Sequence, residues 1–313
     1  MKFFKDQTKI DFMSRGRLAM ILSAVFILIS IVSLSTRGLN FGLDFTGGTL
    51  IEVSYPSAPQ VSDVRENLSA SGFPDAVVQT FGTATDIVVR IPPRPEGGSN
   101  ADLSTEVLQA LQQGVEGEID MRRVEFVGPQ VGEDLSEQGI LAVIYALIGI
   151  FLYIMFRFQW RFSVGAVIAV VHDVMISLGV LSLLQIEFDL TVVAALLAVI
   201  GYSLNDTIVL FDRIRENFPR MLKAKPVQVV NTSINQTLSR TMMTSLTTLL
   251  VLIALFVFGG QIIHAFAFTL IAGVIVGTYS SIYVASTSLL ELGVSKYDLL
   301  QVEKEGAGLD TRP

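Results

Sequence analysis

Asp206 is the residue whose type and position point most directly to chemistry. It lies in the apolar segment 190–211, about six residues, or roughly 9 Å of helix, from the charged residues that follow this segment. A charged side chain inside a bilayer is costly, so one that is present usually faces protein or water and has a function. Ser203, Asn205 and Thr207 supply polar neighbours. We therefore predict that Asp206 carries a proton or a cation.

Arg240 is the predicted counter-charge. It lies where the apolar segment 241–258 begins, in the same third of the membrane as Asp206. Burial and a nearby guanidinium act in opposite directions on the proton affinity of a carboxylate, so such a pair can load and release a proton. Hydroxyl groups spaced by four, three and four residues lie on one helical face of this segment: Thr237, Thr241, Thr244 and Thr248. This stripe fits two uses, either to hydrate a narrow path or to hydrogen-bond a neighbouring helix.

A second pair of titratable residues, His172 and Asp173, lies in the apolar segment 163–184. Histidine is the side chain that titrates near neutral pH when it is unperturbed. Adjacent residues on a helix diverge by about 100°, so we expect only one of the two to face the same path as Asp206. Each also has a structural explanation, a hydrogen bond between helices. Together with Asp206 and Arg240 they form the predicted proton relay.

Six apolar segments position these residues, and each is long enough to cross a hydrocarbon core of about 30 Å. They are 18–34, 139–156, 163–184, 190–211, 241–258 and 265–290. The chain is 51% hydrophobic and only 16% charged, whereas soluble proteins contain about 25% charged residues. Lys and Arg gather in the flanks 1–17, 157–162 and 212–240, while the short loops 185–189 and 259–264 contain none. Because basic flanks remain in the cytoplasm, both termini are predicted to be cytoplasmic.

The segment between the first two spans is polar and punctuated by Gly and Pro. Its pattern predicts strands at 49–55, 76–81, 87–91 and 121–127 and helices at 61–70 and 102–113. This β-α-β-β-α-β order is that of a ferredoxin-like α+β fold. No catalytic constellation or phosphate-binding loop occurs and Cys is absent. We expect no enzyme activity, no cofactor, no metal and, for lack of a basic patch with aromatics, no nucleic-acid partner.

The predicted organisation is therefore a polytopic α-helical membrane protein with one small outer domain. Its parts are a cytoplasmic segment 1–17, a first helix 18–35, a periplasmic domain 36–137, five further helices within 138–291 and a cytoplasmic tail 292–313. Gly201 beside Asp206, and Gly273 with Gly277 in the last span, are expected to let neighbouring helices approach closely.

Five motifs resemble the SecD/SecF family of protein-export membrane proteins, part of the resistance-nodulation-division superfamily. They are Gly42-Leu-Asp44-Phe45-Thr-Gly47-Gly48, His172-Asp173, Gly201-Tyr-Ser-Leu-Asn205-Asp206-Thr, Asp212-Arg-Ile-Arg-Glu216 and Arg240-Thr-x-x-Thr244-Ser245. The resemblance covers essentially the whole chain. It implies half of a transporter in the bacterial inner membrane, with SecD as the other half. It also implies association with SecYEG and use of the proton gradient to draw preproteins out on the periplasmic side.

The same resemblance implies residue roles. Asp206 and Arg240 match positions associated with the proton path in the family. Asp44, Phe45, Gly47 and Gly48 match a signature near the membrane face, which we interpret as conformational because the residues themselves indicate only a Gly-rich turn.

Two other functions fit the sequence less well. A drug-efflux half-transporter of the same superfamily usually has a much larger outer domain. A scaffold that holds the translocon together without transport would use the buried charges only to join helices. The coupling ion also stays open, because a carboxylate with hydroxyl neighbours serves either H⁺ or Na⁺.

Overall fold

The computed structural model describes residues 8–93, 100–260 and 263–295 of the chain. Residues 1–7 of the predicted N-terminal segment, residues 296–313 of the predicted tail, the Pro- and Gly-rich loop at 94–99 and residues 261–262 lie outside the described residues.

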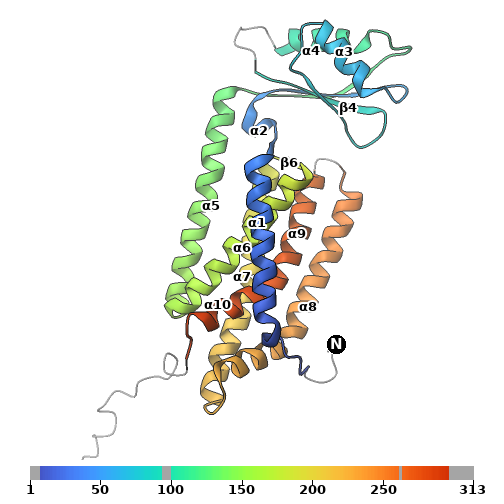
Figure 1. Ribbon diagram of the computed structural model, residues 1–313. Helices are drawn as coiled ribbons and strands as arrows, with labels where there is room; N and C mark the ends of the chain where they lie inside the picture. The colour runs from blue at the N-terminus through green and yellow to red at the C-terminus, as the bar shows by residue number, and fades with distance from the viewer. Residues whose placement is uncertain (1–7, 94–99, 261–262, 296–313) are drawn as a thin grey trace, which may run out of the picture.

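Six long apolar helices form the membrane domain within the described residues, as predicted (Figure 1). They are α1 (Gly16–Thr36), α5 (Pro129–Arg157), α6 (Trp160–Leu184), α7 (Leu190–Arg220), α8 (Pro226–Phe258) and α9 (His264–Ser280). A short turn, η1 (Met13–Arg15), precedes α1, and α9 continues through the π-helical η3 (Ser281–Ala285) into α10 (Ser286–Glu291). The chain is thus a polytopic helical membrane protein.

Helices α7 and α8 extend beyond the apolar segments from which they were predicted. The end of α7 and the start of α8 pack against each other through apolar side chains, among them Ile214 and Phe218 on α7 and Val230 and Ile234 on α8. This amphipathic contact keeps both ends helical outside the apolar core, because packing supplies most of the stability of a helix.

Helices α6 and α7 form the centre of the bundle. In the most apolar 18-residue stretch of each helix, 50% of the residues are buried within the chain. The corresponding share for α5, which stands at the side of the bundle in Figure 1, is 6%. Asp206, His172 and Asp173 therefore lie on the two most enclosed helices, where their charges are shielded from lipid.

Glycines set the distance between α9 and α7. A methyl group built on Gly277 would lie 3.1 Å from the Cβ atom of Ser203, and one built on Gly273 would overlap Val199. The predicted role of these glycines is confirmed. The expectation for Gly201 is wrong, because a methyl group there would meet no atom within 4 Å. Gly201 lies on an exposed face of α7, so its small size serves no contact with a described residue.

Gly273→Ala is therefore expected to destabilise the bundle, by about 1–3 kcal/mol, because α9 must move away from Val199. Gly201→Ala is the matched control, and we expect it to be neutral or to stabilise by up to about 1 kcal/mol through helix propensity alone. Thermal unfolding of both variants in detergent measures the difference. Equal effects of the two substitutions would contradict the close approach of α9 and α7.

The outer domain follows the predicted element order. Its elements are β2 (Gly48–Ser54), α3 (Val61–Ala70), β3 (Val77–Thr80), β4 (Asp86–Ile91), α4 (Asn100–Gln112) and β5 (Asp120–Val127). The strands form an antiparallel sheet in the order β3-β4-β2-β5. Helices α3 and α4 cover the sheet face that points away from the membrane helices (Figure 1). The core between these layers includes Ile51, Val89, Leu68 and Leu111, all at most 1% exposed.

Candidate ion-translocation site

Asp206 lies in the middle of α7 and is only 4% exposed. Within the described residues its Oδ2 atom has no hydrogen-bond partner and its carboxylate forms no ion pair. Two side chains of α8 act on this carboxylate, Arg240 through its positive charge and Thr244 through its nearby hydroxyl group. A buried carboxylate oxygen without a partner is unfavourable. The geometry therefore leaves this oxygen open to a proton, a cation or water.

Arg240 is near Asp206 but does not contact it at ion-pair distance in the part of the chain that the structure describes. The Arg240 side chain is exposed, so Arg240 acts on Asp206 through its charge and not through two parallel hydrogen bonds from the guanidinium to the carboxylate. The predicted neighbourhood of the two charges thus agrees with the structure, while a direct bond between them is not formed.

This separation predicts how Arg240 variants behave. Arg240→Lys is expected to keep most of the gradient-driven activity, because a point charge at the same place suffices. Arg240→Gln is expected to lose it. Ion flux through reconstituted vesicles compares the two. Equal loss in both variants would show that the guanidinium geometry itself is required.

His172 and Asp173 form a buried polar network with α7. The Asp173 Oδ1 atom lies 2.8 Å from His172 Nδ1, and its Oδ2 atom accepts a hydrogen bond from Ser203 Oγ at 2.5 Å. Ser203 lies one helical turn before Asp206. The His172 ring instead lies beside Tyr279, with ring centroids 6.2 Å apart, and its Nε2 atom has no partner among the described residues. Asp173 thus hydrogen-bonds to α7, whereas which of the two residues faces the path from Asp206 stays a prediction.

The residues predicted to line the path differ in burial. Ser203 and Thr207 of α7 and Thr241 of α8 are buried, and the Oγ1 atom of Thr207 has no partner within the described residues. Asn205 is exposed on α7, on a face that no described helix covers closely. Thr244 is half-buried and, like Thr237, donates to carbonyl oxygens of its own helix, and Thr248 is half-buried too.

A second polar cluster joins three helices beside this site and was not predicted as a cluster. The Tyr202 hydroxyl donates to Ser245 Oγ at 3.2 Å, and Ser245 Oγ lies 2.7 Å from Thr278 Oγ1. Ser245 is part of the motif that begins at Arg240, but Thr278 is one of two threonines in the apolar α9, and nothing in the sequence distinguishes it. This cluster ties α7, α8 and α9 together around Asp206.

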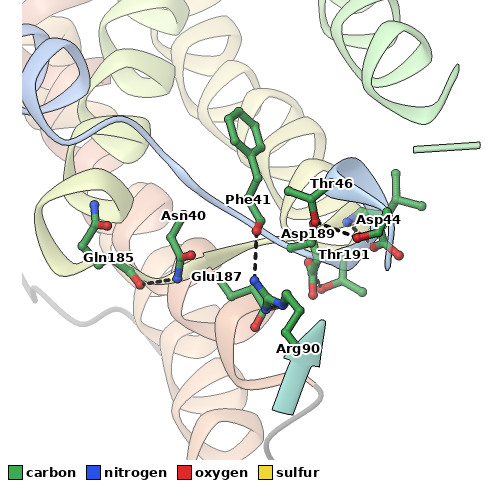
Figure 2. Close-up of polar contacts among 12 residues, drawn as sticks. Asn40, Phe41, Asp44, Thr46, Arg90, Gln185, Glu187, Asp189 and Thr191 are labelled. Atoms are coloured by element: carbon green, nitrogen blue, oxygen red, sulfur yellow. Dashed lines mark hydrogen bonds and ion pairs between the residues drawn. The ribbon is translucent and has the colours of Figure 1, made fainter. Parts of the chain in front are cut away.

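The outer end of α7 is attached to the segment that leads into the outer domain (Figure 2). Strand β1 (Asn40–Phe41) pairs in parallel with β6 (Glu187–Phe188), and the short helix α2 (Leu43–Thr46) follows. Asp44 Oδ2 accepts a hydrogen bond from the Leu190 N–H at 2.9 Å, so this carboxylate caps the helix that carries Asp206.

Arg90 of β4 fastens the sheet to the same junction (Figure 2). Its guanidinium lies 2.6 Å from a Glu187 carboxylate oxygen and donates to the Phe41 carbonyl oxygen at 3.2 Å. Burial raises the pKa of Glu187, Arg90 opposes that rise, and three nearby carboxylates add to it. The contact joins residues far apart in the sequence and was not predicted.

The raised pKa of Glu187 predicts a pH dependence. Protonation favours the folded junction, so the stability contributed by this group is fully present below its ordinary pKa of 4.5 and is lost as pH rises through the folded value. Glu187→Gln cannot titrate. Its melting temperature relative to the wild type should therefore increase as pH rises from 4.5 into the neutral range, in thermal unfolding of the full chain. A difference that does not change with pH would contradict this assignment.

Two family models match the chain. Protein export membrane protein SecD/SecF, C-terminal, matches residues 107–295, which include every predicted relay residue. The chain belongs to the SecD/SecF family. The SecD/SecF GG motif matches residues 32–55 and thus includes α2 and its cap on α7.

Relatives of this SecD/SecF chain share its full length. Protein translocase subunit SecF of Vibrio alginolyticus is 52% identical over 100% of this chain and 99% of the relative. The subunit of Pseudomonas aeruginosa is 48% identical over 97% of this chain and 98% of the relative. The crystal structure of SecDF, a translocon-associated membrane protein from Thermus thermophilus, is similar with a TM-score of 0.83 at 37% identity. The similarity covers 92% of this chain and 39% of the SecDF chain, so this chain spans about two fifths of that protein.

The glycines of the SecD/SecF GG motif have a steric explanation here. Gly47 and Gly48 have backbone φ angles of 66° and 115°, which residues other than glycine rarely adopt. A Cβ atom on Gly48 would also collide with the carbonyl oxygen of Ile91 in β4. Both glycines therefore let the chain turn sharply from α2, whose Asp44 contacts the start of α7, into strand β2. The conformational role of Asp44, Phe45 and the glycines stays a prediction with which this turn is compatible.

Proposed function

We propose that this chain is the SecF subunit of a SecDF complex that uses the proton gradient to help preproteins leave SecYEG. Family membership, the names of its relatives and its likeness to SecDF support the process. The buried Asp206 carboxylate, with Oδ2 unpaired among the described residues, carries the proposal of ion coupling. SecD would supply the other half of the transporter. The chain would act without enzyme activity or cofactor.

The proposed orientation is that of a multi-pass protein of the bacterial inner membrane with cytoplasmic termini. The distribution of Lys and Arg supports it, because the basic flanks lie on the face opposite the outer domain. The outer domain would then be periplasmic. Its element order and the strand order β3-β4-β2-β5 support a ferredoxin-like fold.

The geometry suggests how a proton becomes movement. A proton on Asp206 removes the attraction to Arg240 and so changes how α7 packs on α8. Because Asp44 caps the outer end of α7 and Arg90 holds the adjoining loop, a displacement of α7 passes to the outer domain. One charge that crosses the membrane supplies about 2.3 kcal/mol per 100 mV, enough to shift a two-state equilibrium by more than tenfold.

One observation favours the scaffold alternative. Both carboxylate oxygens of Asp173 are hydrogen-bonded, one to the adjacent His172 and the other to Ser203 of α7, and the second bond is expected for a residue that joins helices. This observation does not extend to Asp206, whose Oδ2 atom lacks a partner among the described residues. We therefore assign the ion to Asp206 and regard the Asp173 network as adjoining it.

The test uses the complex of this chain with SecD and SecYEG in vesicles. Export of a preprotein is measured under an imposed proton gradient, under a sodium gradient and with both collapsed. We expect export to rise with the proton gradient alone, together with proton flux reported by a dye that senses internal pH. Stimulation that persists with both gradients collapsed would identify a scaffold, and stimulation by sodium alone would replace the proton as coupling ion.

A further inference from the structure

A cavity of about 680 Å³ lies at the end of the helix bundle opposite the outer domain, and no function assigned above uses it. It is open to the surface and lined by the start of α1, the start of α8 and the end of α10. The walls carry two basic side chains, Arg17 and Lys225, and one acidic side chain, Glu291. It therefore combines a concave shape with a net positive charge.

The positive charge of the cavity has two sources. The first is the pair Arg17 and Lys225, neither of which forms an ion pair with a residue that the structure describes. The second source is the N-terminus of the 33-residue helix α8, which begins at Pro226 on the cavity wall. The N–H groups of Gln228 and Val229 bond to the Lys225 carbonyl oxygen, so among the described residues the Val227 N–H is the first-turn group left to an anion.

Thr287 gives independent evidence for a ligand. It lines the cavity, its side chain is 8% exposed, and its Oγ1 atom has no hydrogen-bond partner within the described residues. The hydroxyl points toward Gly16, another wall residue, because a methyl group built there would lie 3.1 Å from Oγ1. A buried hydroxyl without a partner is costly, and a ligand in the cavity that accepts a hydrogen bond would satisfy it.

We propose that this cavity binds a phosphate group of an anionic ligand. Arg17 and Lys225 neutralise its charge, the Val227 N–H at the start of α8 donates a hydrogen bond, and Thr287 donates its hydroxyl. The headgroup of an anionic phospholipid and free phosphate share this chemistry. The surface of α1 next to the cavity favours the lipid, because Leu18 and Ile21, which follow Arg17 but do not line the cavity, are 66% and 63% exposed and offer an apolar surface for acyl chains. The proposal does not depend on ion coupling at Asp206.

The test measures binding to the purified full-length chain in detergent. The probes are dioleoyl phosphatidylglycerol, dioleoyl phosphatidylcholine and inorganic phosphate, and bound lipid is counted by native mass spectrometry. We expect phosphatidylglycerol to bind in preference to phosphatidylcholine. The double variant Arg17→Gln, Lys225→Gln should weaken binding roughly tenfold or more, and Thr287→Val should weaken it several-fold, as for lost hydrogen bonds to a charged group.

Two matched variants keep the result specific. Lys223→Gln removes the same charge two residues from Lys225, outside the cavity wall, and should leave binding unchanged. Glu291→Gln removes the acid on the wall and should tighten binding, which tests the site in the opposite direction without loss of a contact. Displacement of the lipid by inorganic phosphate, or binding of phosphate alone, would also support the anion site. It would identify free phosphate, and not a lipid headgroup, as the ligand. Equal phosphatidylglycerol binding by the wild type, the double variant and Glu291→Gln would overturn the proposal.

Discussion

Asp206→Asn is expected to abolish the stimulation of export by the proton gradient while the complex remains assembled. Asparagine has nearly the same shape as aspartate but cannot take up a proton, so export should fall to the rate seen with the gradient collapsed. The fold should tolerate the change, because it removes a charge that is 4% exposed and forms no ion pair among the described residues. Export rate and melting temperature, measured on the same preparation, separate loss of coupling from loss of folding.

Asp212→Asn is the matched control on the same helix. Asp212 lies beyond the apolar part of α7 and pairs with Arg157 at 3.0 Å, with both side chains substantially exposed. Exposed ion pairs contribute at most about 1 kcal/mol, so this variant should retain both export and stability. If Asp206→Asn exported as fast as Asp212→Asn under the gradient, Asp206 would not be the coupling residue.

The membrane helices and the central charge could be predicted because their signals are local in sequence. An apolar run of about 20 residues has few alternatives to a membrane span, and a carboxylate within it is conspicuous. Gly273 and Gly277 were also predictable, since their spacing places both on one helical face. The strands of the outer domain were identified from alternation, as for β2, whose residues Ile51 and Val53 are fully buried.

The contacts between distant elements could not be predicted in the same way. Asp44 caps α7 at a residue 146 positions away, and Arg90 reaches Glu187 across 97 positions. Periodicity describes which face of one element is buried, but it does not say which element covers that face. The same limit explains Gly201, where a small residue beside the key charge indicated helix contact and the structure provides none from the described residues.

Asp173 and Ser203 are expected to be strongly coupled in a double-mutant cycle. Asp173 is 1% exposed and accepts hydrogen bonds from Ser203 and from the neighbouring His172 ring, so Asp173→Ala should destabilise the bundle by about 3–5 kcal/mol. Ser203→Ala should cost about 1–3 kcal/mol. A hydrogen bond to a charged acceptor predicts a coupling energy of about 1.5–3 kcal/mol between the two substitutions, measured by unfolding in detergent.

Tyr202 and Ser245 form the control pair, because their part-buried hydrogen bond also joins two helices but involves two neutral groups. Hydrogen bonds between membrane helices average about 0.6 kcal/mol, and we expect the cycle of Tyr202→Phe with Ser245→Ala to give this value. A coupling of Asp173 with Ser203 no larger than that of the control would mean that Asp173 is not a charged acceptor. In that case Asp173 would join α6 to α7 as an ordinary polar residue, and ion coupling would be confined to Asp206 and its neighbours on α8.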